Sequence, residues 1–105
     1  MSIGGKREQP VVLRAELETQ FTDAELSVGY AIADRILAHW QGYHGRTLAG
    51  LKSLPIKEHG PWTRTQSAYH DHAESSFSHA LACVRSMEAA HSARLTGRDS
   101  GRGNP

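Results

Sequence analysis

The chain has 105 residues, which is room for one small domain with a modest core. Its 12 Lys and Arg residues against 11 Asp and Glu residues give a formal net charge of +1, which disfavours a protein dedicated to nucleic-acid binding. The only cysteine, Cys83, excludes a disulfide within the chain, and no apolar run suits a signal-peptide core or a membrane span. We therefore expect a cytoplasmic protein that makes no membrane contact.

Residues 10–18 have an ambiguous pattern. The residues that alternate with polar ones as in a strand are Val11, Leu13, Ala15 and Leu17. The residues that instead suit a helix, with Pro10 at its first position, are Val12, Leu13, Glu16 and Leu17. A lone strand needs a partner, which would have to come from another chain. In a monomer, the pattern therefore favours a short helix or an extended arm.

A first long helix is predicted over residues 22–41. Thr22 and Glu25 have the spacing of a capping box, and Phe21 precedes the cap as an apolar staple. Gly42 is well placed to end the helix in a left-handed turn. Apolar residues recur at steps of three and four positions along this segment, at Leu26, Tyr30, Ala33, Ile36 or Leu37, and Trp40.

Glycines and prolines mark the connection that follows, within which residues 47–54 are predicted to form a short middle helix. A second long helix is predicted over residues 63–95, with Thr63 and Gln66 as a weaker capping box and Gly97 as its stop. Its serine-rich centre permits a kink, but one continuous helix is the better interpretation. The apolar positions of this helix are Tyr69, Ala73, Phe77, Ala80, Leu81, Val84, Met87 and Leu95.

These elements predict a mainly α fold, a small helical bundle built on an antiparallel pair of unequal helices. At 1.5 Å of rise per residue the second helix is much the longer, so part of its apolar stripe extends beyond the first. Either the N-terminal segment, the middle of the chain or a second subunit must cover that surplus. The surplus consists of Val84, Met87, His91 and Leu95.

The polar ends set the expected domain organisation. Residues 1–9 are expected to form a flexible arm, and residues 97–105 a disordered tail, because their composition buries too little apolar surface. A single helical domain over residues 10–96 lies between them.

Seven histidines are many for this length and raise the question of a metal site. On a helix, His72, His79 and Cys83 share one flank, with His79 and Cys83 one turn apart. A structural zinc site needs four protein ligands, and the sequence contains no metal-binding motif that supplies them. We therefore expect no metal and no cofactor, and the solvated flank is the favoured interpretation.

No catalytic motif is present either, since no strand-turn-helix elbow surrounds Cys83 or a serine, and the carboxylates are spread over exposed positions. We expect that the chain is not an enzyme. The leading hypothesis is a non-enzymatic protein–protein interaction module, a homodimer that acts as a small regulator, inhibitor or adaptor of a larger assembly, as small proteins of phages and mobile elements do.

Candidate partner-binding residues come from the aromatic and basic residues around the connection and from the surplus of the second helix. A DNA-associated regulator is the first alternative and a histidine-rich metal-binding protein the second. The candidate partner-binding residues are Tyr43, His44, Arg46, Lys57, Trp62, Arg64, Val84, Met87, His91 and Leu95.

Overall fold

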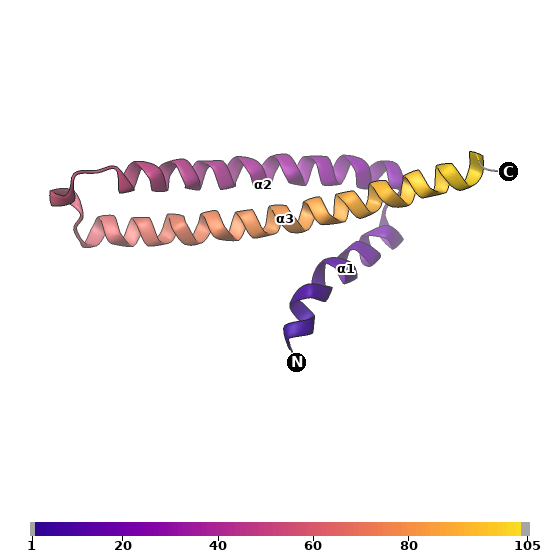
Figure 1. Ribbon diagram of the computed structural model, residues 1–105, viewed down its shortest axis with the longest axis horizontal. Coiled ribbons are helices and arrows are strands. Elements are labelled where there is room, and N and C mark those ends of the chain that lie inside the picture. The colour runs from indigo at the N-terminus through magenta and orange to yellow at the C-terminus, as the bar shows by residue number, and fades with distance from the viewer. Residues whose placement is uncertain (1, 104–105) are drawn as a thin grey trace. The chain divides into compact units, whose positions relative to one another are not determined.

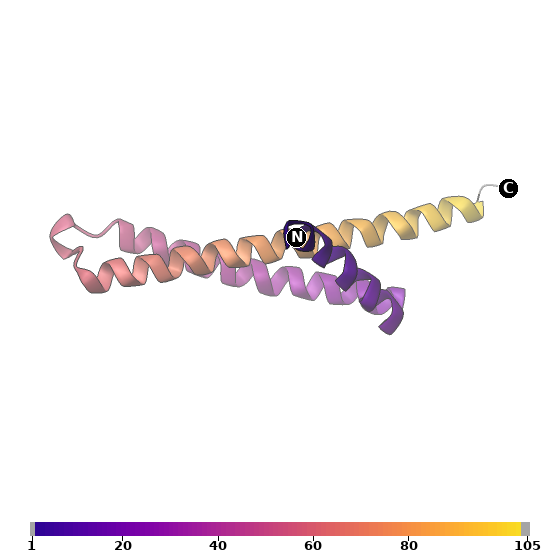
Figure 2. The same ribbon diagram turned by 90° about the horizontal axis from the view of Figure 1, so that it is seen from below.

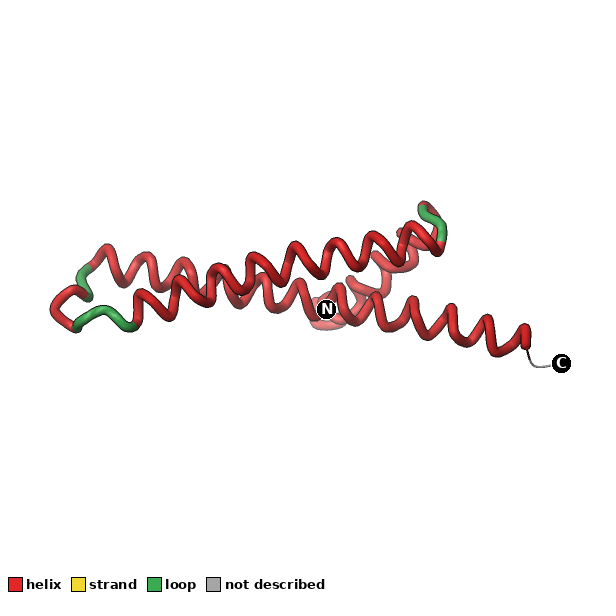
Figure 3. Tube along the Cα trace, turned by 90° about the horizontal axis from the view of Figure 1, so that it is seen from above, coloured by secondary structure: helices red, strands yellow, loops and turns green. Residues whose placement is uncertain are grey.

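The structure is a computed structural model, which describes the backbone of residues 2–103 and the side chains of residues 11–97. Its elements are α1 (Ser2–Gln20), α2 (Asp23–Lys52), the 3₁₀ helix η1 (Ile56–Glu58) and α3 (Pro61–Gly103) (Figure 1). Within the described backbone, loops are confined to the junction of α1 with α2 and the connection around η1 (Figure 3). The predicted mainly α fold with a long helix pair and a short helix between them is confirmed.

The bounds of the first long helix differ from the prediction. Gly42 does not end α2, because no described residue has the positive φ that a helix-terminating glycine needs. Before Gly42, Gln41 donates a hydrogen bond of 3.0 Å to Glu74 of α3, and after it His44 contacts His70 of α3 at 2.9 Å. These contacts on both sides of Gly42 offset the cost of a helical glycine, about 1 kcal/mol. Most of the predicted middle helix, residues 47–54, therefore belongs to α2, and the short helix of the connection is η1.

The α1 bounds resolve the ambiguity of residues 10–18 in favour of helix. At the other long helix, α3 begins at Pro61, a residue suited to the first helical position, and not at Thr63. Thr63 is no cap: its hydroxyl donates to the Glu58 carbonyl at 2.8 Å. The serine-rich centre of α3 is helical throughout, as predicted.

Gly97 does not stop α3, which continues to Gly103. The flexible arm over residues 1–9 and the disordered tail over residues 97–105 stay predictions. Met1 and residues 104–105 lie outside the described backbone, and residues 1–10 and 98–105 lie outside the described side chains. The single domain over residues 10–96 also stays a prediction.

The contacts of the chain group into two compact units. Unit 1 consists of Met1–Asp34 and Ala82–Pro105, and unit 2 of Arg35–Leu81. Each unit therefore contains a part of α2 and a part of α3.

In unit 2, the second part of α2 and the first part of α3 run antiparallel and side by side (Figures 1 and 2). The connection that contains η1 joins them. Buried polar side chains are prominent in the contact between the helices, where His44 of α2 meets His70 of α3.

In unit 1, α1 joins the start of α2 through a tight turn at residues 21–22. The predicted capping box forms this turn: the Thr22 backbone N–H donates to the Glu25 carboxylate at 2.8 Å, and the Glu25 N–H donates to the Thr22 hydroxyl at 3.1 Å. Leu26, Tyr30 and Met87 form the buried core cluster of this unit.

Candidate functional site

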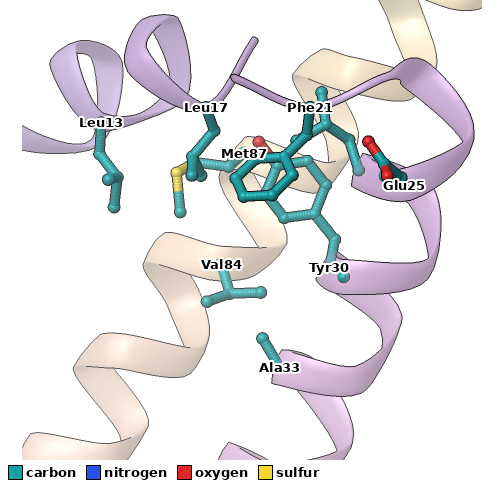
Figure 4. Close-up of a pocket in the computed structure, with 10 residues that line it drawn as sticks. Leu13, Leu17, Phe21, Glu25, Tyr30, Ala33, Val84 and Met87 are labelled. Atoms are coloured by element: carbon teal, nitrogen blue, oxygen red, sulfur yellow. The ribbon is translucent and has the colours of Figure 1, made fainter. Parts of the chain in front are cut away.

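An apolar groove with a volume of about 360 Å³ lies in unit 1 between α1, α2 and α3 (Figure 4). Glu25 is the only charged residue among those that line it. Transfer of an apolar side chain from water into such a groove is favourable, so the groove suits apolar side chains. The lining residues are Leu13, Leu17, Phe21, Glu25, Leu26, Gly29, Tyr30, Ala33, Val84 and Met87.

The groove forms where the last turns of α1 meet α3 and the first part of α2. Leu17 and Val84, both half-buried, pack against the core cluster from α1 and α3. Figure 4 shows Leu17 and Met87 pointing toward one another across the groove, with Leu13 one turn before Leu17. Leu17 of the N-terminal segment thus packs against the core cluster that contains Met87, one of the residues expected to need a cover.

A second, shallower hollow runs along α2 in the same unit. Phe21, Glu25 and Gly29 line both hollows, so the two are neighbours on one surface. Val28 and Ile32 line the second hollow and keep 59% and 54% of their surface exposed. Val11, Val12, Leu13 and Phe21 are also exposed, and we call the two hollows with these exposed residues the unit 1 apolar surface.

A polar cluster beside the groove connects all three helices. Arg94 of α3 donates to Asp23 of α2 at 2.7 Å, and its Nε lies 3.6 Å from the Glu18 carboxylate of α1. The hydrogen bond to Asp23 raises the pKa of the Arg94 guanidinium, while burial lowers it. Arg94 also lies 3.1 Å from Nδ1 of His91, whose Nε2 lies 3.0 Å from the Ser27 hydroxyl. We call these five residues the Arg94 cluster.

The hydrogen bonds of the Arg94 cluster fix the tautomer of His91. A guanidinium has only donors, so Nδ1 of His91 must accept from Arg94 and must carry no proton. The neutral ring then carries its proton on Nε2, which donates to Ser27. A general base needs an unprotonated nitrogen facing the serine, so this Ser27–His91 pair has the wrong polarity for nucleophilic catalysis.

Tyr30 is 4% exposed and lies beside this cluster, with its ring edge-on to His91 at 5.7 Å between centroids. Its hydroxyl is buried and has no hydrogen-bond partner. Burial first, and then the charge of Glu18, raise the pKa of Tyr30 above its ordinary value of 10.0, and nearby guanidinium groups oppose this shift.

Unit 2 contains a cluster of aromatic and imidazole rings. His44 and His70, each 7% exposed, are joined by a contact of 2.9 Å between their Nδ1 atoms. Phe77 stacks on His44 with 5.6 Å between centroids. Tyr43 and Tyr69 contact the pair edge-on and remain exposed.

The predicted partner-binding residues fall into both units. In unit 1, Met87 and His91 are buried, whereas Val84 and Leu95 are half-buried. His91 has the lowest exposure among the described side chains, at 1%, so other residues of the same chain cover it and it offers no surface to a partner.

In unit 2, Tyr43 and His44 belong to the ring cluster, and His44 is buried within it. Arg46, Lys57, Trp62 and Arg64 are all exposed, Trp62 at 66%. Arg64 donates to the backbone carbonyl of His59 at 3.3 Å, which holds it beside the connection.

The candidate metal ligands His72, His79 and Cys83 are not part of a complete ligand set among the described side chains. His72 and His79 are exposed and Cys83 is half-buried. Within the described side chains, no three His, Cys, Asp or Glu residues are placed to hold a metal ion.

Sequence reasoning missed the residues that build the site from α1 and from the end of α3. Leu13 and Leu17 fit the helical alternative for residues 10–18, but nothing in that pattern indicates that they line a groove. Arg94 follows His91 by three residues and so shares its helix face, but its bonds to Asp23 and Glu18 depend on the fold.

No family model, curated protein or solved structure matches this chain. Among the described residues, no helix has the length and hydropathy needed to span a membrane.

Proposed function

We propose that this chain is a non-enzymatic protein–protein interaction module, and that the unit 1 apolar surface binds a second copy of the chain. The observation that supports this proposal is the groove itself, which is lined almost entirely by apolar residues and bordered by exposed ones. Such a surface costs free energy in water, and exposed apolar patches are typical of interaction sites, which supports the proposal.

The unit 1 apolar surface also carries the two features that a symmetric dimer requires. A two-fold interface brings the same patch of both chains together, so the patch must present projections as well as hollows. Phe21, Val28 and Ile32 project beside the groove, and Gly29 leaves space on α2 with nothing within 4 Å of an added Cβ atom. A second helix is able to approach closely at this glycine.

We further propose that the dimer serves as a regulator, inhibitor or adaptor of a larger assembly. Ile56 and Trp62 of unit 2 are 86% and 66% exposed, and the exposed Lys57 and Arg64 accompany them. Trp and Arg are frequent anchors of protein interfaces, so we assign the contact with a different protein to these residues. Site-specific crosslinking in the source cells from position 62 should capture one protein that crosslinking from exposed His72 does not, and identical products from both positions would contradict the assignment.

A matched pair of glycine substitutions tests the dimer. Gly29 and Gly50 both lie in α2 with nothing within 4 Å of an added Cβ atom, so a single chain has room for a Cβ atom at either position. Gly29→Arg places a charge in the proposed interface, whereas Gly50→Arg, in unit 2, does not.

Light scattering should give the wild type about twice the mass of 11.5 kDa. We expect Gly29→Arg to raise the dimer dissociation constant by about tenfold or more, which is 1.4 kcal/mol or more, and Gly50→Arg to leave it unchanged. A wild-type monomer at high micromolar concentration, or equal effects of the two variants, would contradict the proposal.

A further inference from the structure

His91 occupies a position where a neutral ring fits and a charged ring does not. It is 1% exposed, and both of its ring nitrogens already have partners. Nδ1, the only nitrogen free to take a second proton, faces a nitrogen of Arg94 at 3.1 Å. A protonated imidazole would place two cationic donors against each other, with no acceptor between them.

The other charges of the cluster do not remove this conflict. Glu18 and Asp23 would attract a charged ring, but Arg94 contacts both carboxylates and Arg14 lies 3.7 Å from Glu18. The charged groups are therefore already balanced, two carboxylates against two guanidiniums, before the imidazole takes up a proton. The charged and titratable groups around the ring are Arg14 and Glu18 on α1, Asp23 and Tyr30 on α2, and Arg94 on α3.

Separation of Arg94 from the ring would affect the groove directly. The same guanidinium connects α3 to Glu18 of α1 and to Asp23 of α2, so its movement weakens both connections. Glu18 follows Leu17, which lines the groove from α1. Tyr30 contacts the His91 ring and lines the groove from α2. Protonation of the buried His91 ring would thus affect both Leu17 and Tyr30, which line the groove.

We propose that the His91–Arg94 contact is a proton-sensitive latch, which holds α1 against the helix pair at neutral pH and releases it on acidification, so that the dimer dissociates. Imidazole is the side chain whose ordinary titration lies closest to neutral pH, so mild acidification is the perturbation expected to break this contact. The release of α1 depends on unit 1 alone. The dissociation of the dimer rests on the function proposed above.

Two measurements at about pH 7.5 and about pH 5.5 test the latch, using the full chain. Amide hydrogen-exchange protection factors of α1 report its release, and light scattering reports the dimer. In the wild type we expect α1 protection to fall by about tenfold or more at the lower pH, and the dimer dissociation constant to rise by a similar factor.

His91→Gln separates protonation from the loss of a bond, because the amide can accept from Arg94 and donate to Ser27 but does not titrate in this range. It should remove the pH dependence of α1 protection. His72→Gln, at an exposed position, is the matched control and should retain that dependence. Arg94→Met, a second variant, should lower α1 protection at neutral pH and leave little further loss on acidification.

The outcomes separate the latch from the dimer. Unchanged α1 protection in the wild type at the lower pH, or an equal loss in His91→Gln, would overturn the latch. A monomer at neutral pH would contradict the proposed function, while the exchange measurement would still decide whether acid releases α1.

Discussion

At the scale of single residues, the buried polar groups determine how this small protein responds to substitution. The described core contains His44, His70 and His91 beside few apolar side chains. Each of these rings has a defined hydrogen-bonding partner, whereas the hydroxyl of Tyr30 has none. Because a buried polar group costs free energy unless it is paired, substitutions at these positions should change the free energy of unfolding measurably.

Tyr30→Phe should raise the free energy of unfolding by about 1 kcal/mol at neutral pH, because it removes an unpaired buried hydroxyl. Burial raises the pKa of Tyr30, so ionisation of its hydroxyl adds a further cost to the folded state. That cost is absent below about pH 10 and grows as the pH rises through the folded-state pKa. Urea denaturation should therefore show an alkaline loss of stability in the wild type that is smaller in Tyr30→Phe. A destabilised variant with an unchanged alkaline profile would contradict this account.

The His44–His70 pair should show strong coupling. The Nδ1 atoms lie 2.9 Å apart, so one ring donates and the other accepts. His44→Leu or His70→Leu alone leaves a buried nitrogen unpaired and should cost about 1–3 kcal/mol. The double variant should cost at least about 1 kcal/mol less than the sum of the single costs, as a double-mutant cycle by urea denaturation measures. Strict additivity would show that the contact contributes nothing.

At the scale of elements, local chemistry predicted the starts of helices better than their ends. The Thr22 and Glu25 capping box is an interaction between near neighbours, and the structure contains both of its hydrogen bonds. Gly42 and Gly97 are weak stop signals, because a glycine ends a helix only if the chain then adopts a positive φ. Packing between helices decides that, and a sequence pattern does not reveal it.

Thr22→Ala should lower the free energy of unfolding by about 1 kcal/mol, because the Glu25 backbone N–H loses its acceptor at the start of α2. Thr65→Ala, at an exposed position inside α3, is the control and should change stability by less than about 0.5 kcal/mol. Chemical denaturation of both variants makes the comparison. Equal losses would show that the capping box adds nothing beyond the removal of a threonine.

At the scale of the whole molecule, the sequence predicted the fold class and left open what covers the surplus of the second long helix. Within unit 1, α1 covers part of this surplus, because Leu17 packs against the core cluster that includes Met87. That contact joins residues 70 positions apart, and Arg94 meets Asp23 across 71 positions. Periodicity identifies the apolar face of each helix, but it does not specify which faces meet. The groove and the Arg94 cluster were therefore not predictable.

The coverage by α1 changes the basis of the dimer hypothesis. The sequence predicts association from an uncovered surplus of Val84, Met87, His91 and Leu95, but Met87 and His91 are buried within a single chain. The basis is now the groove that α1 creates and the exposed residues beside it. The expected partner is the same, but the surface that binds it is different.

Isotope-filtered nuclear Overhauser spectra of a one-to-one mixture of labelled and unlabelled chains test the proposed dimer interface. We expect cross-peaks between copies that join the ring of Phe21 to the methyl groups of Leu13, Leu17 or Met87, which line the groove. These cross-peaks should vanish in Gly29→Arg and persist in Gly50→Arg. Contacts between copies that involve only residues of unit 2, or no contacts at all, would contradict it.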